Sequence, residues 1–407
     1  MNRQYTAYLE ELLTFFPCVA IIGPRQCGKT TFLKELPSDW TFFDLEKRAD
    51  YQTITRDPDL FLRLNPSKIV IDEAQIAPEL FSALRVAIDS DRNTKGRFII
   101  TGSSSPSLLK NVSESLAGRI GIIEMAPLSF AEVSNIQKVT FFDLLKNSGP
   151  KANDLLELSV TNTVSASHEY WLHGGYPEPW LSKNSRFREQ WSEAYFRTYV
   201  ERDVSRLFPG LNFVRFKQFV QMLAGLSGSI INYSEIGRDI GTSFLTIREY
   251  FEIAHGTFLW RSIPCYHKKV SKRIVKHPRG HLRDSGLLHH LLKLKDLNSL
   301  LSHPQMGRSW ESVVIEEILR GLSCRGISHD YSYYRTHAGA EVDLVLEGAF
   351  GLMPIEIKYT QSVDTRSLRA LTEFVEENGC PFGIVINNDE SVRKLTDKII
   401  GVPFLAL

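Results

Sequence analysis

The sequence predicts an α/β protein made of several domains, and three observations lead to this prediction. The chain has 407 residues, more than one hydrophobic core normally serves. In its N-terminal third, short apolar runs that end in polar residues alternate with helix-like segments, as they do in a parallel sheet covered by helices. The last hundred residues read helix, three strands, helix and strand, an order that fits a mixed central sheet.

Composition indicates an ordinary globular protein of the cytoplasm. Hydrophobic residues make up 43% and charged residues 23%, and the net charge is +1. No apolar run approaches the roughly 18 residues that span a bilayer, and the first residues lack the pattern of a signal peptide. The five cysteines are widely spaced and form no CxxC pair, which argues against disulfides and zinc. We therefore expect a cytoplasmic protein with no membrane partner.

The stretch CVAIIGPRQCGKTTFLKEL carries the pattern of a phosphate-binding loop, with a strand-like run before it and a helix-like run after it. In such a loop backbone N–H groups surround the phosphates, Lys29 reaches the β and γ oxygens, and the Thr30 hydroxyl ligates Mg²⁺. The alternative is a glycine-rich turn with a chance lysine. The residues that we expect to contact ATP here are Gly23, Pro24, Arg25, Gln26, Cys27, Gly28, Lys29, Thr30 and Thr31.

An acidic element supports this interpretation. In KIVIDEAQ, Asp72 and Glu73 follow an apolar run, so a buried strand presents both carboxylates at the edge where ligands bind in open α/β sheets. We expect Asp72 to hold Mg²⁺ and Glu73 to polarise the attacking water as a catalytic residue. The next strand, RFIITGSSS, ends in hydroxyls. Thr101, Ser103 or Ser104 is expected to sense the γ-phosphate or orient that water, with Ser103 the preferred nucleotide contact.

Arg119 stands in a short polar turn of SESLAGRIGIIEM. One interpretation is a solvated arginine. The other is a catalytic arginine finger, whose planar charge stabilises the transferring phosphoryl group in a neighbouring subunit of a homo-oligomer. The spacing leaves both interpretations open.

Together, GPRQCGKTT, FFDLE, IVIDEAQ, ITGSSS and LAGRI, followed by APLSF, resemble a family of prokaryotic AAA-type ATPases that carry a C-terminal domain of unknown function (DUF4143). GGYPEPWL, YVERDV, HKKVSKRIVK and RDSGLL continue the resemblance through nearly the whole chain. It implies a P-loop AAA-type ATPase core, for which we take residues 1–132, and it favours the finger role of Arg119. Residues 133–210, with apolar residues at three-to-four spacing, predict a helical lid or linker.

Residues 211–285 predict a winged helix-turn-helix. Two short helices, over 234–240 and 243–253, flank a glycine turn and precede the strand-like TFLWRSIPCY. Ser234 and Ser243 stand where the N-caps of these helices belong.

The same region predicts a DNA partner. The second of these helices presents Thr242, Thr246 and Arg248 to a groove. Residues 261–283 contain eight Lys or Arg and no Asp or Glu, a local field that attracts nucleic acid. Two alternatives stay open: a protein-binding winged helix, and a solvated hairpin with alternating lysines.

Residues 300–407 predict an α/β domain whose hairpin EVDLVLEGAFGLMPIEIKYT carries carboxylates and a lysine. Because side chains alternate along a strand, Glu356 and Lys358 share one face, and Asp343 lies in the neighbouring strand. Two carboxylates brought together repel unless a cation lies between them, and hard oxygen ligands suit Mg²⁺ or Mn²⁺. Such a site hydrolyses phosphodiesters through metal-activated water, which Lys358 would position or deprotonate.

This pattern resembles the PD-(D/E)XK nuclease superfamily, with Asp343 followed by Glu356-x-Lys358. Glu311 matches the extra acid that many members place in the preceding helix. The resemblance implies a restriction-endonuclease-like fold with Glu311, Asp343 and Glu356 as metal ligands. Val342 stands where members have a proline. Two alternatives remain: a retained pattern that binds DNA without cutting, and an ordinary hairpin with a charged, wet face.

The whole sequence predicts an ATP-hydrolysing protein that acts on DNA, with ATP and Mg²⁺ as cofactors and Mn²⁺ as an option at the C-terminal site. ATP binding would order the lid and subunit contacts, and hydrolysis would release them. The alternative function is a regulatory nucleotide switch whose C-terminal half binds a protein and performs no chemistry. A third is a nucleic-acid-binding ATPase whose tail grips DNA and does not cut it.

Overall fold

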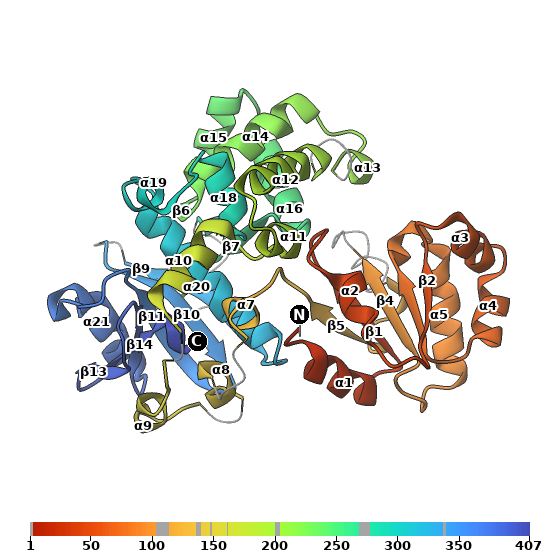
Figure 1. Ribbon diagram of the computed structural model, residues 1–407, viewed down its shortest axis with the longest axis horizontal. Coiled ribbons are helices and arrows are strands. Elements are labelled where there is room, and N and C mark those ends of the chain that lie inside the picture. Colours follow the sequence, from red (N-terminus) through yellow and green to blue (C-terminus); the bar gives the residue numbers. More distant parts are fainter. Residues whose placement is uncertain are drawn as a thin grey trace. The chain divides into compact units, whose positions relative to one another are not determined.

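Figure 1 shows the computed structural model, which describes residues 3–102, 114–135, 140–146, 149–160, 162–199, 204–267, 277–336 and 339–407. The chain forms two compact units. The first comprises Met1–Leu128 with Gly256–Phe258, and the second comprises Ser129–His255 with Leu259–Leu407. Among the described helices, none is both long enough and apolar enough to cross a membrane.

The first unit is built on a five-stranded parallel sheet with the order β2-β3-β4-β1-β5. Its strands are β1 (Cys18–Ile22), β2 (Thr41–Asp44), β3 (Ile69–Asp72), β4 (Phe98–Gly102) and β5 (Ile120–Glu124). Its helices are α1 (Thr6–Phe15), α2 (Lys29–Leu33), α3 (Arg48–Thr55), α4 (Pro58–Leu64), η1 (Ala74–Ile76) and α5 (Glu79–Ser90). β1, β3 and β4 are buried along their whole length. This burial explains their continuous apolar sequences, and the predicted parallel sheet is confirmed.

The strand order brings three sequence-distant segments to one edge of this sheet. β1 pairs with β4 and β5, and β4 also pairs with β3. Because these strands are parallel, their carboxyl ends lie at the same edge, where ligands bind in open α/β folds. The loop that follows β1 therefore lies near Asp72, the last residue of β3, and Thr101 in β4.

The second unit begins with short helices that lead into a three-helix region. The helices before this region are α7 (Phe130–Val133), α8 (Phe141–Leu144), α9 (Ala152–Leu156), α10 (Val164–His173), α11 (Pro177–Leu181), α12 (Ser185–Thr198) and α13 (Ser205–Leu207). The region itself runs α14 (Phe213–Leu226), β6 (Ser229–Ile230), α15 (Tyr233–Ile240), α16 (Phe244–Gly256), β7 (Trp260–Ile263) and β8 (Arg279–Leu282). Its strands form an antiparallel sheet in the order β6-β8-β7.

One of the two predicted helix caps in this region is correct. Ser243 Oγ accepts a hydrogen bond from the backbone N–H of Thr246 at 3.1 Å, as an N-cap of α16 does. The cap predicted at Ser234 is wrong, because Asn232 accepts the backbone N–H of Ser234 at 3.2 Å and α15 begins at Tyr233. Asparagine caps a helix as well as serine does, and here it comes first along the chain.

The C-terminal sheet of the second unit is mixed, with the strand order β13-β14-β12-β11-β10-β9. Its strands are β9 (His329–Arg335), β10 (Glu341–Gly348), β11 (Gly351–Ile357), β12 (Gly383–Asn387), β13 (Arg393–Thr396) and β14 (Ile399–Pro403). The helices that follow β8 along the chain are α18 (Ser285–Leu291), α19 (Leu297–Leu301), α20 (Met306–Ser323), η3 (Thr365–Leu368), α21 (Arg369–Asn378) and η4 (Phe404–Ala406). The predicted order of helix, three strands, helix and strand matches α20 to β12, and β13 and β14 extend the sheet.

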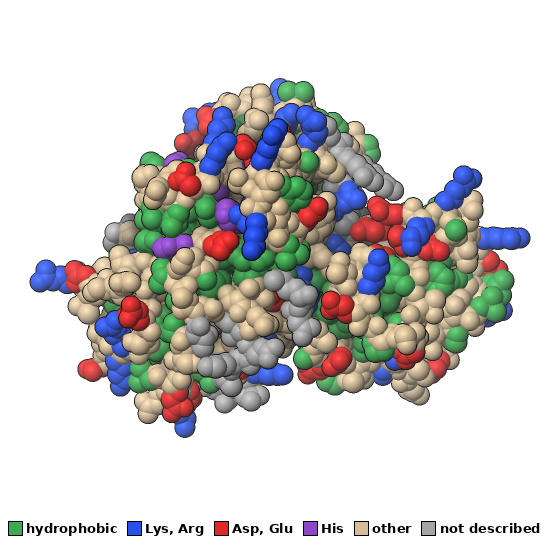
Figure 2. Space-filling model, viewed as in Figure 1, with side chains coloured by type: hydrophobic (Ala, Val, Ile, Leu, Met, Phe, Trp, Pro, Cys, Tyr) green, Lys and Arg blue, Asp and Glu red, His purple; other side chains and the backbone are tan. Residues whose placement is uncertain are grey.

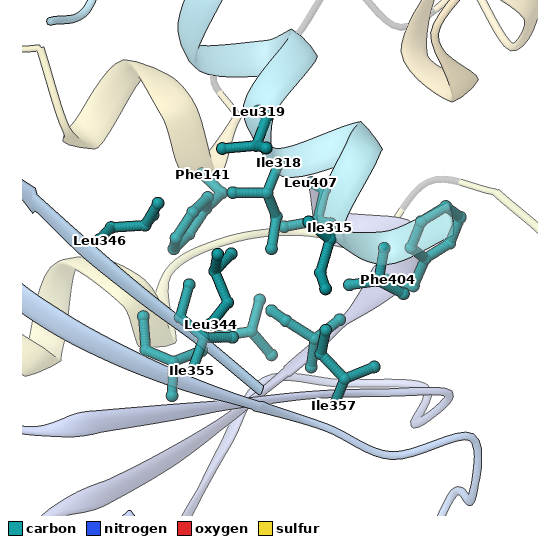
Figure 3. Packing of buried hydrophobic residues seen from close by; sticks show 14 of the residues in the cluster. Phe141, Ile315, Ile318, Leu319, Leu344, Leu346, Ile355, Ile357, Phe404 and Leu407 are labelled. Atoms are coloured by element: carbon teal, nitrogen blue, oxygen red, sulfur yellow. The ribbon is translucent and has the colours of Figure 1, made fainter. Parts of the chain in front are cut away.

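This sheet is covered on both faces. Figure 3 shows Ile315 and Ile318 of α20 with Leu344 of β10 and Ile355 of β11 in one hydrophobic cluster. α21 packs on the opposite face through a second cluster that includes Phe374 and residues of β10, β12 and β14. Alternation along the strands divides the apolar residues between the two clusters.

Part of the segment predicted as a lid or linker belongs to this same core. Phe141, Phe142 and Leu145 are buried in the cluster that contains α20 and the C-terminal sheet, and Phe141 is drawn there in Figure 3. The periodicity of a helix indicates that it buries one face but does not identify the surface that it buries against. The role of residues 133–210 as a lid or linker stays a prediction.

Candidate functional site

The loop after β1 has the backbone shape that a close approach to phosphate requires. Gly28 has a φ of 98° and Gln26 a φ of 60°, both in the left-handed region. A Cβ on Gly23 would lie 2.1 Å from the carbonyl oxygen of Met125, so no larger residue fits there. α2 begins directly after the loop, at Lys29. Backbone N–H groups at the start of a helix are thereby available to an anion.

Lys29 is buried, and its ammonium is held by the loop itself. Its Nζ donates to the carbonyl oxygens of Gly23 at 3.0 Å and Pro24 at 2.9 Å. Charged acceptors bind an ammonium more strongly than neutral carbonyls do. Phosphate oxygens can therefore replace these two partners.

Arg3, near the N-terminus, was not predicted from the sequence, and its side chain binds the backbone of the loop. Arg3 is buried, and its guanidinium donates to the carbonyl oxygens of Cys27 and Ala126, each at 2.7 Å. Cys27 belongs to the loop and Ala126 follows β5, so one side chain joins the two segments. Tyr5 adds a hydroxyl that accepts the backbone N–H of Ala126 at 3.1 Å. No local pattern signals this contact, since 123 residues separate Arg3 from Ala126.

Three predicted side chains converge at the carboxyl edge of the first sheet. Thr30 Oγ1 donates to Asp72 Oδ2 at 2.7 Å, and the hydroxyl of Thr101 donates to Asp72 Oδ1. The backbone N–H of Glu73 donates to Thr101 Oγ1 at 3.1 Å. Neutral hydroxyls thus hold Asp72, and no basic side chain among the described residues pairs with it. A hydroxyl and a carboxylate side by side are ligands that Mg²⁺ accepts beside phosphate oxygens.

Two further predicted residues flank this cluster. Glu73 has a φ of 56°, an uncommon conformation for a residue with a side chain, and accepts a hydrogen bond from the amide of Gln75. Arg25 of the loop lies 3.5 Å from the carboxylate of Glu46. Ser103 and Ser104 lie outside the described residues, so their predicted contacts stay predictions.

Arg119 forms an ion pair within the first unit. Its Nε and one terminal nitrogen each donate to a different oxygen of Asp89, at 2.8 Å. The hydrogen bond to Asp89 raises the pKa of Arg119, and the same bond lowers the pKa of Asp89. A guanidinium that acts on a neighbouring subunit must leave this pair. Both interpretations of Arg119 therefore stay open.

The tail brings its predicted residues together in one cluster, here named the carboxylate pocket, in which Asp343 and Glu356 are buried and Glu311 and Lys358 are partly exposed. Glu311 comes from α20, Asp343 from β10, and Glu356 and Lys358 from the end of β11. Lys358 Nζ donates to Glu356 Oε1 at 2.7 Å, and Asp343 Oδ2 accepts the backbone N–H of Ile357 at 2.8 Å. The pairing of β10 with β9 shifts its register at Asp343. Irregularities of this kind re-aim a side chain.

An unpredicted cation lies in the carboxylate pocket. Arg279 of β8 donates from one terminal nitrogen to Asp343 Oδ1 at 3.2 Å and Glu341 Oε1 at 3.4 Å. Its other terminal nitrogen donates to Glu311, and its Nε donates to the carbonyl oxygen of Gly228 at 3.0 Å. The expected cation between the carboxylates is therefore present as a guanidinium. Among the described residues, no group of three or more His, Cys, Asp or Glu is arranged to hold a metal ion.

Burial shapes the electrostatics of the carboxylate pocket. Burial, and then the charge of Asp343, raise the pKa of Glu311 to about 7 and that of Glu356 to about 8. Burial lowers the pKa of Lys358, but the carboxylates of Glu356 and Asp343 outweigh it and raise that pKa above its ordinary value. Glu356 Oε2 is buried without a hydrogen-bond partner among the described residues. Glu311 and Glu356 therefore hold protons at a pH where exposed carboxyl groups are ionised.

Part of the basic run predicted to attract nucleic acid forms ion pairs inside the protein. Glu316 of α20 accepts two bonds from the guanidinium of Arg261, at 2.5 and 3.1 Å, and lies 3.5 Å from that of Arg283 and 3.0 Å from His281. Burial alone would raise the pKa of Glu316, but the charges of Arg261 and Arg283 outweigh burial and hold this pKa well below its ordinary value. Arg261, Arg279 and Arg283 are all buried, so the prediction of an available field is wrong for these three. The remaining basic residues, Lys268, Lys269, Lys272, Arg273 and Lys276, lie outside the described residues.

Two motifs without evident chemistry, GGYP and RDSGLL, pack against each other. The backbone N–H of Gly175 donates to Asp284 Oδ2 at 2.8 Å, and Asp284 also caps α18. A Cβ on Gly174 would lie 2.3 Å from Asp284 Oδ1, and a Cβ on Gly286 would lie 2.1 Å from the carbonyl oxygen of His173. These motifs therefore form a close contact within the second unit. In the sequence, the glycines next to an aspartate that can cap a helix are the feature that indicates this contact.

The fold and the loop define the class of this protein. A phosphate-binding loop leaves the interior strand β1 of a parallel sheet, and the ends of β3 and β4 place Asp72 and Thr101 at the same edge. Residues 16–134 match the family described as AAA domain. The first unit therefore contains the AAA-type P-loop ATPase domain that the sequence predicted, and the protein is an ATP-binding ATPase.

Comparison with known proteins identifies the family. Residues 306–407 match a domain of unknown function (DUF4143), and residues 165–298 match another (DUF8612). The chain is 30% identical over 407 residues to uncharacterized proteins of Mycobacterium tuberculosis and Mycobacterium bovis, covering 99% of this chain and 83% of each relative. The chain belongs to this family of AAA-domain proteins with a C-terminal DUF4143 domain. An uncharacterized protein of Methanocaldococcus jannaschii is 23% identical over 399 residues, which is 92% of this chain and 83% of that protein.

Solved structures resemble the chain more remotely. The Walker-type ATPase of Pyrococcus abyssi is 15% identical, with a TM-score of 0.40, over 71% of this chain and 95% of that one. The RuvB Holliday junction branch migration motor of Thermotoga maritima is 16% identical, with a TM-score of 0.29, over 67% of this chain and 94% of that one.

Proposed function

We propose that this ATPase acts on DNA through a winged helix-turn-helix and a nuclease-like tail. The observation that carries the proposal is the element order from α14 to β8 with the sheet order β6-β8-β7. A helix-turn-helix followed by two antiparallel strands is the arrangement of a winged helix. ATP binding and hydrolysis would then change how the tail meets DNA.

At the ATP site we assign a role to each predicted residue. The loop residues 23–31 bind the phosphates, with Lys29 on their oxygens, and Thr30 and Asp72 hold Mg²⁺. The 2.7 Å separation of Thr30 Oγ1 and Asp72 Oδ2 supports this pairing. Bound Mg²⁺ supplies positive charge against the developing negative charge of the phosphoryl group. Glu73 polarises the attacking water, and Thr101 fixes the Asp72–Glu73 turn.

Arg119 completes this site in a homo-oligomer, where it reaches the nucleotide of a neighbouring subunit. Its planar guanidinium suits the phosphoryl group that transfers during hydrolysis. The Asp89 pair would hold the side chain until subunits meet.

In the winged helix, α16 is the proposed recognition helix. Arg248 is exposed on this helix, and Thr246 and the preceding Thr242 are half-buried. Arg248 pairs with Glu252 at 3.1 Å, so phosphate or base contact requires exchange of this surface partner. Figure 2 shows basic and acidic side chains interspersed over the helical region at the top of the view. Acidic side chains repel phosphate, so this surface by itself would bind DNA only weakly.

In the tail we propose a divalent metal held by Glu311, Asp343 and Glu356. Their oxygens suit Mg²⁺ or Mn²⁺, and the buried Glu356 Oε2 without a hydrogen-bond partner among the described residues is an available ligand. The metal would supply an activated water. Lys358 Nζ, 2.7 Å from Glu356, would orient that water toward a phosphodiester.

A second candidate function is a regulatory ATPase switch that binds a protein. The exposed apolar start of α16 favours it, since Phe244 is 42% and Leu245 is 70% exposed. Aromatic and aliphatic side chains at the N-terminal end of a recognition helix contact protein more readily than phosphate. In this case the tail performs no chemistry.

One assay separates these functions. ATP turnover and plasmid integrity are measured together, with and without duplex DNA and Mn²⁺. We expect duplex DNA to change turnover and Mn²⁺ to produce nicks. If duplex DNA does not change ATP turnover and shows no mobility shift at low salt, the protein-binding switch replaces DNA action as the function. DNA binding without nicks under any metal would leave an ATPase whose tail grips DNA.

A further inference from the structure

The guanidinium of Arg279 occupies the carboxylate pocket as a metal ion would. Its three nitrogens meet four acceptors, the carboxylates of Glu311, Glu341 and Asp343 and the carbonyl oxygen of Gly228. Arg279 is only 6% exposed, so these bonds form away from bulk water. Hydrogen bonds between charged partners in such surroundings are strong and selective for geometry.

The carboxylates of the pocket outnumber its cations. Four carboxylates, of Glu311, Glu341, Asp343 and Glu356, face two cations, Arg279 and Lys358. If all are ionised, the pocket carries two uncompensated negative charges. Protons or a divalent cation can balance this excess, and the oxygens of Glu311 and Asp343 that a metal needs are bound to Arg279.

Arg279 reaches the carboxylate pocket from a different part of the second unit. It opens β8, which pairs with β6 and β7 of the proposed winged helix. β8 is fixed there, because a Cβ on Gly280 would lie 2.4 Å from the Trp260 side chain and because His281 bonds Glu316 at 3.0 Å. The long side chain of Arg279 can leave the carboxylates by rotation while its strand stays in place.

We propose that Arg279 is an internal competitor of the divalent metal and gates the tail. The carboxylates bind either the guanidinium or the metal, so metal enters only when Arg279 leaves. This inference rests on the proposed metal site of the tail. It assigns Arg279 a regulatory role and makes the winged-helix sheet the part of the protein that controls the carboxylate pocket.

The test is Mn²⁺ binding by the full-length protein without nucleotide, with free Mn²⁺ followed by electron paramagnetic resonance. We expect Arg279→Gln to bind one Mn²⁺ at least about tenfold more tightly than wild type. Adding Asp343→Asn to Arg279→Gln should abolish that gain. Arg261→Gln is the matched control, because it removes an equally buried arginine that pairs with Glu316 outside the pocket. It should leave Mn²⁺ affinity unchanged.

The outcomes separate the gate from the proposed metal site. Wild type that binds Mn²⁺ as tightly as Arg279→Gln overturns the gate and leaves the metal site standing. Absence of binding in both folded proteins overturns the metal site and the gate with it. Tight binding by Arg279→Gln without DNA cleavage supports the gate and removes only the nuclease activity. If Arg279→Gln does not fold, Arg279→Lys, which keeps the charge and loses the fork, should still tighten Mn²⁺ binding, and no change would overturn the gate.

Discussion

Each of the two predicted metal sites of this protein has a buried arginine in its domain or cluster, and the two arginines bind different groups: one binds backbone carbonyls and the other binds the carboxylates. In the ATPase domain, Arg3 binds the backbone carbonyls of Cys27 in the loop and of Ala126 after β5, while Asp72 is held by the hydroxyls of Thr30 and Thr101. In the tail, Arg279 binds the carboxylates directly. A carboxylate held by neutral hydroxyls keeps its charge available to an incoming cation, whereas one paired with a guanidinium does not. The first site is therefore ready for metal, and the second is already neutralised in part.

Loss of the loop lysine should have the largest effect. Lys29→Ala removes the ammonium that reaches the phosphates, so ATP binding should become undetectable and ATP turnover should fall at least about 100-fold. Isothermal titration and a phosphate-release assay measure the two effects. Lys34→Ala, an exposed lysine just after the same helix, is the matched control and should behave as wild type. Wild-type turnover in Lys29→Ala would refute the assignment.

At Glu73, the residue after Asp72, we expect a substitution to reduce ATP hydrolysis without reducing ATP binding. Glu73→Gln keeps the size of the side chain and removes the charge that polarises water, so turnover should fall about 100-fold while ATP affinity stays within about twofold. The control is Glu79→Gln, an exposed change in the first turn of α5. An equal loss of affinity in Glu73→Gln would mean that Glu73 serves binding, not hydrolysis.

A change in the tail should leave the first site untouched. Asp343→Ala removes a proposed ligand, so Mn²⁺-dependent plasmid nicking should fall at least about tenfold, while ATP turnover should stay at the wild-type level. Lys358→Ala should have the same effect. Glu347→Ala, at an exposed position of the same strand, tests for a general charge effect. Nicking that survives in Asp343→Ala would place the cleavage elsewhere, and wild type that cuts neither DNA nor RNA would remove the nuclease altogether.

The smallest effect should come from the arginine that the sequence analysis missed. Arg3→Ala frees the carbonyl oxygens of Cys27 and Ala126, which loosens the loop without removing a phosphate contact. We expect ATP affinity to weaken about threefold, as measured by fluorescent-nucleotide titration. Arg56→Ala, an exposed arginine of the same domain, should leave affinity unchanged. A loss as large as that of Lys29→Ala would show that Arg3 contacts the nucleotide itself.

Local patterns in the sequence predicted part of each site. Lys29, Thr30 and Asp72 were predicted because a loop, a helix start and a strand end each have a short signature, and a hydrogen bond joins Thr30 to Asp72. Thr101 was one of three candidates for a γ-phosphate contact, and its hydroxyl donates to Asp72. The hairpin residues of the tail were predicted from strand alternation. Arg279 was misjudged, because its charge along the chain indicated a solvent-facing basic run, and its partner Asp343 is 64 residues away.

The sequence by itself determined the phosphate-binding loop, the order of the elements and the positions of the acidic residues, because these depend on backbone preferences and on the alternation of apolar residues over a few positions. Only the tertiary structure decided which cation each acid meets and which surface the segment around Phe141 covers. An ion pair or a packed core depends on distance in space, and a linear charge or apolar pattern does not encode that distance.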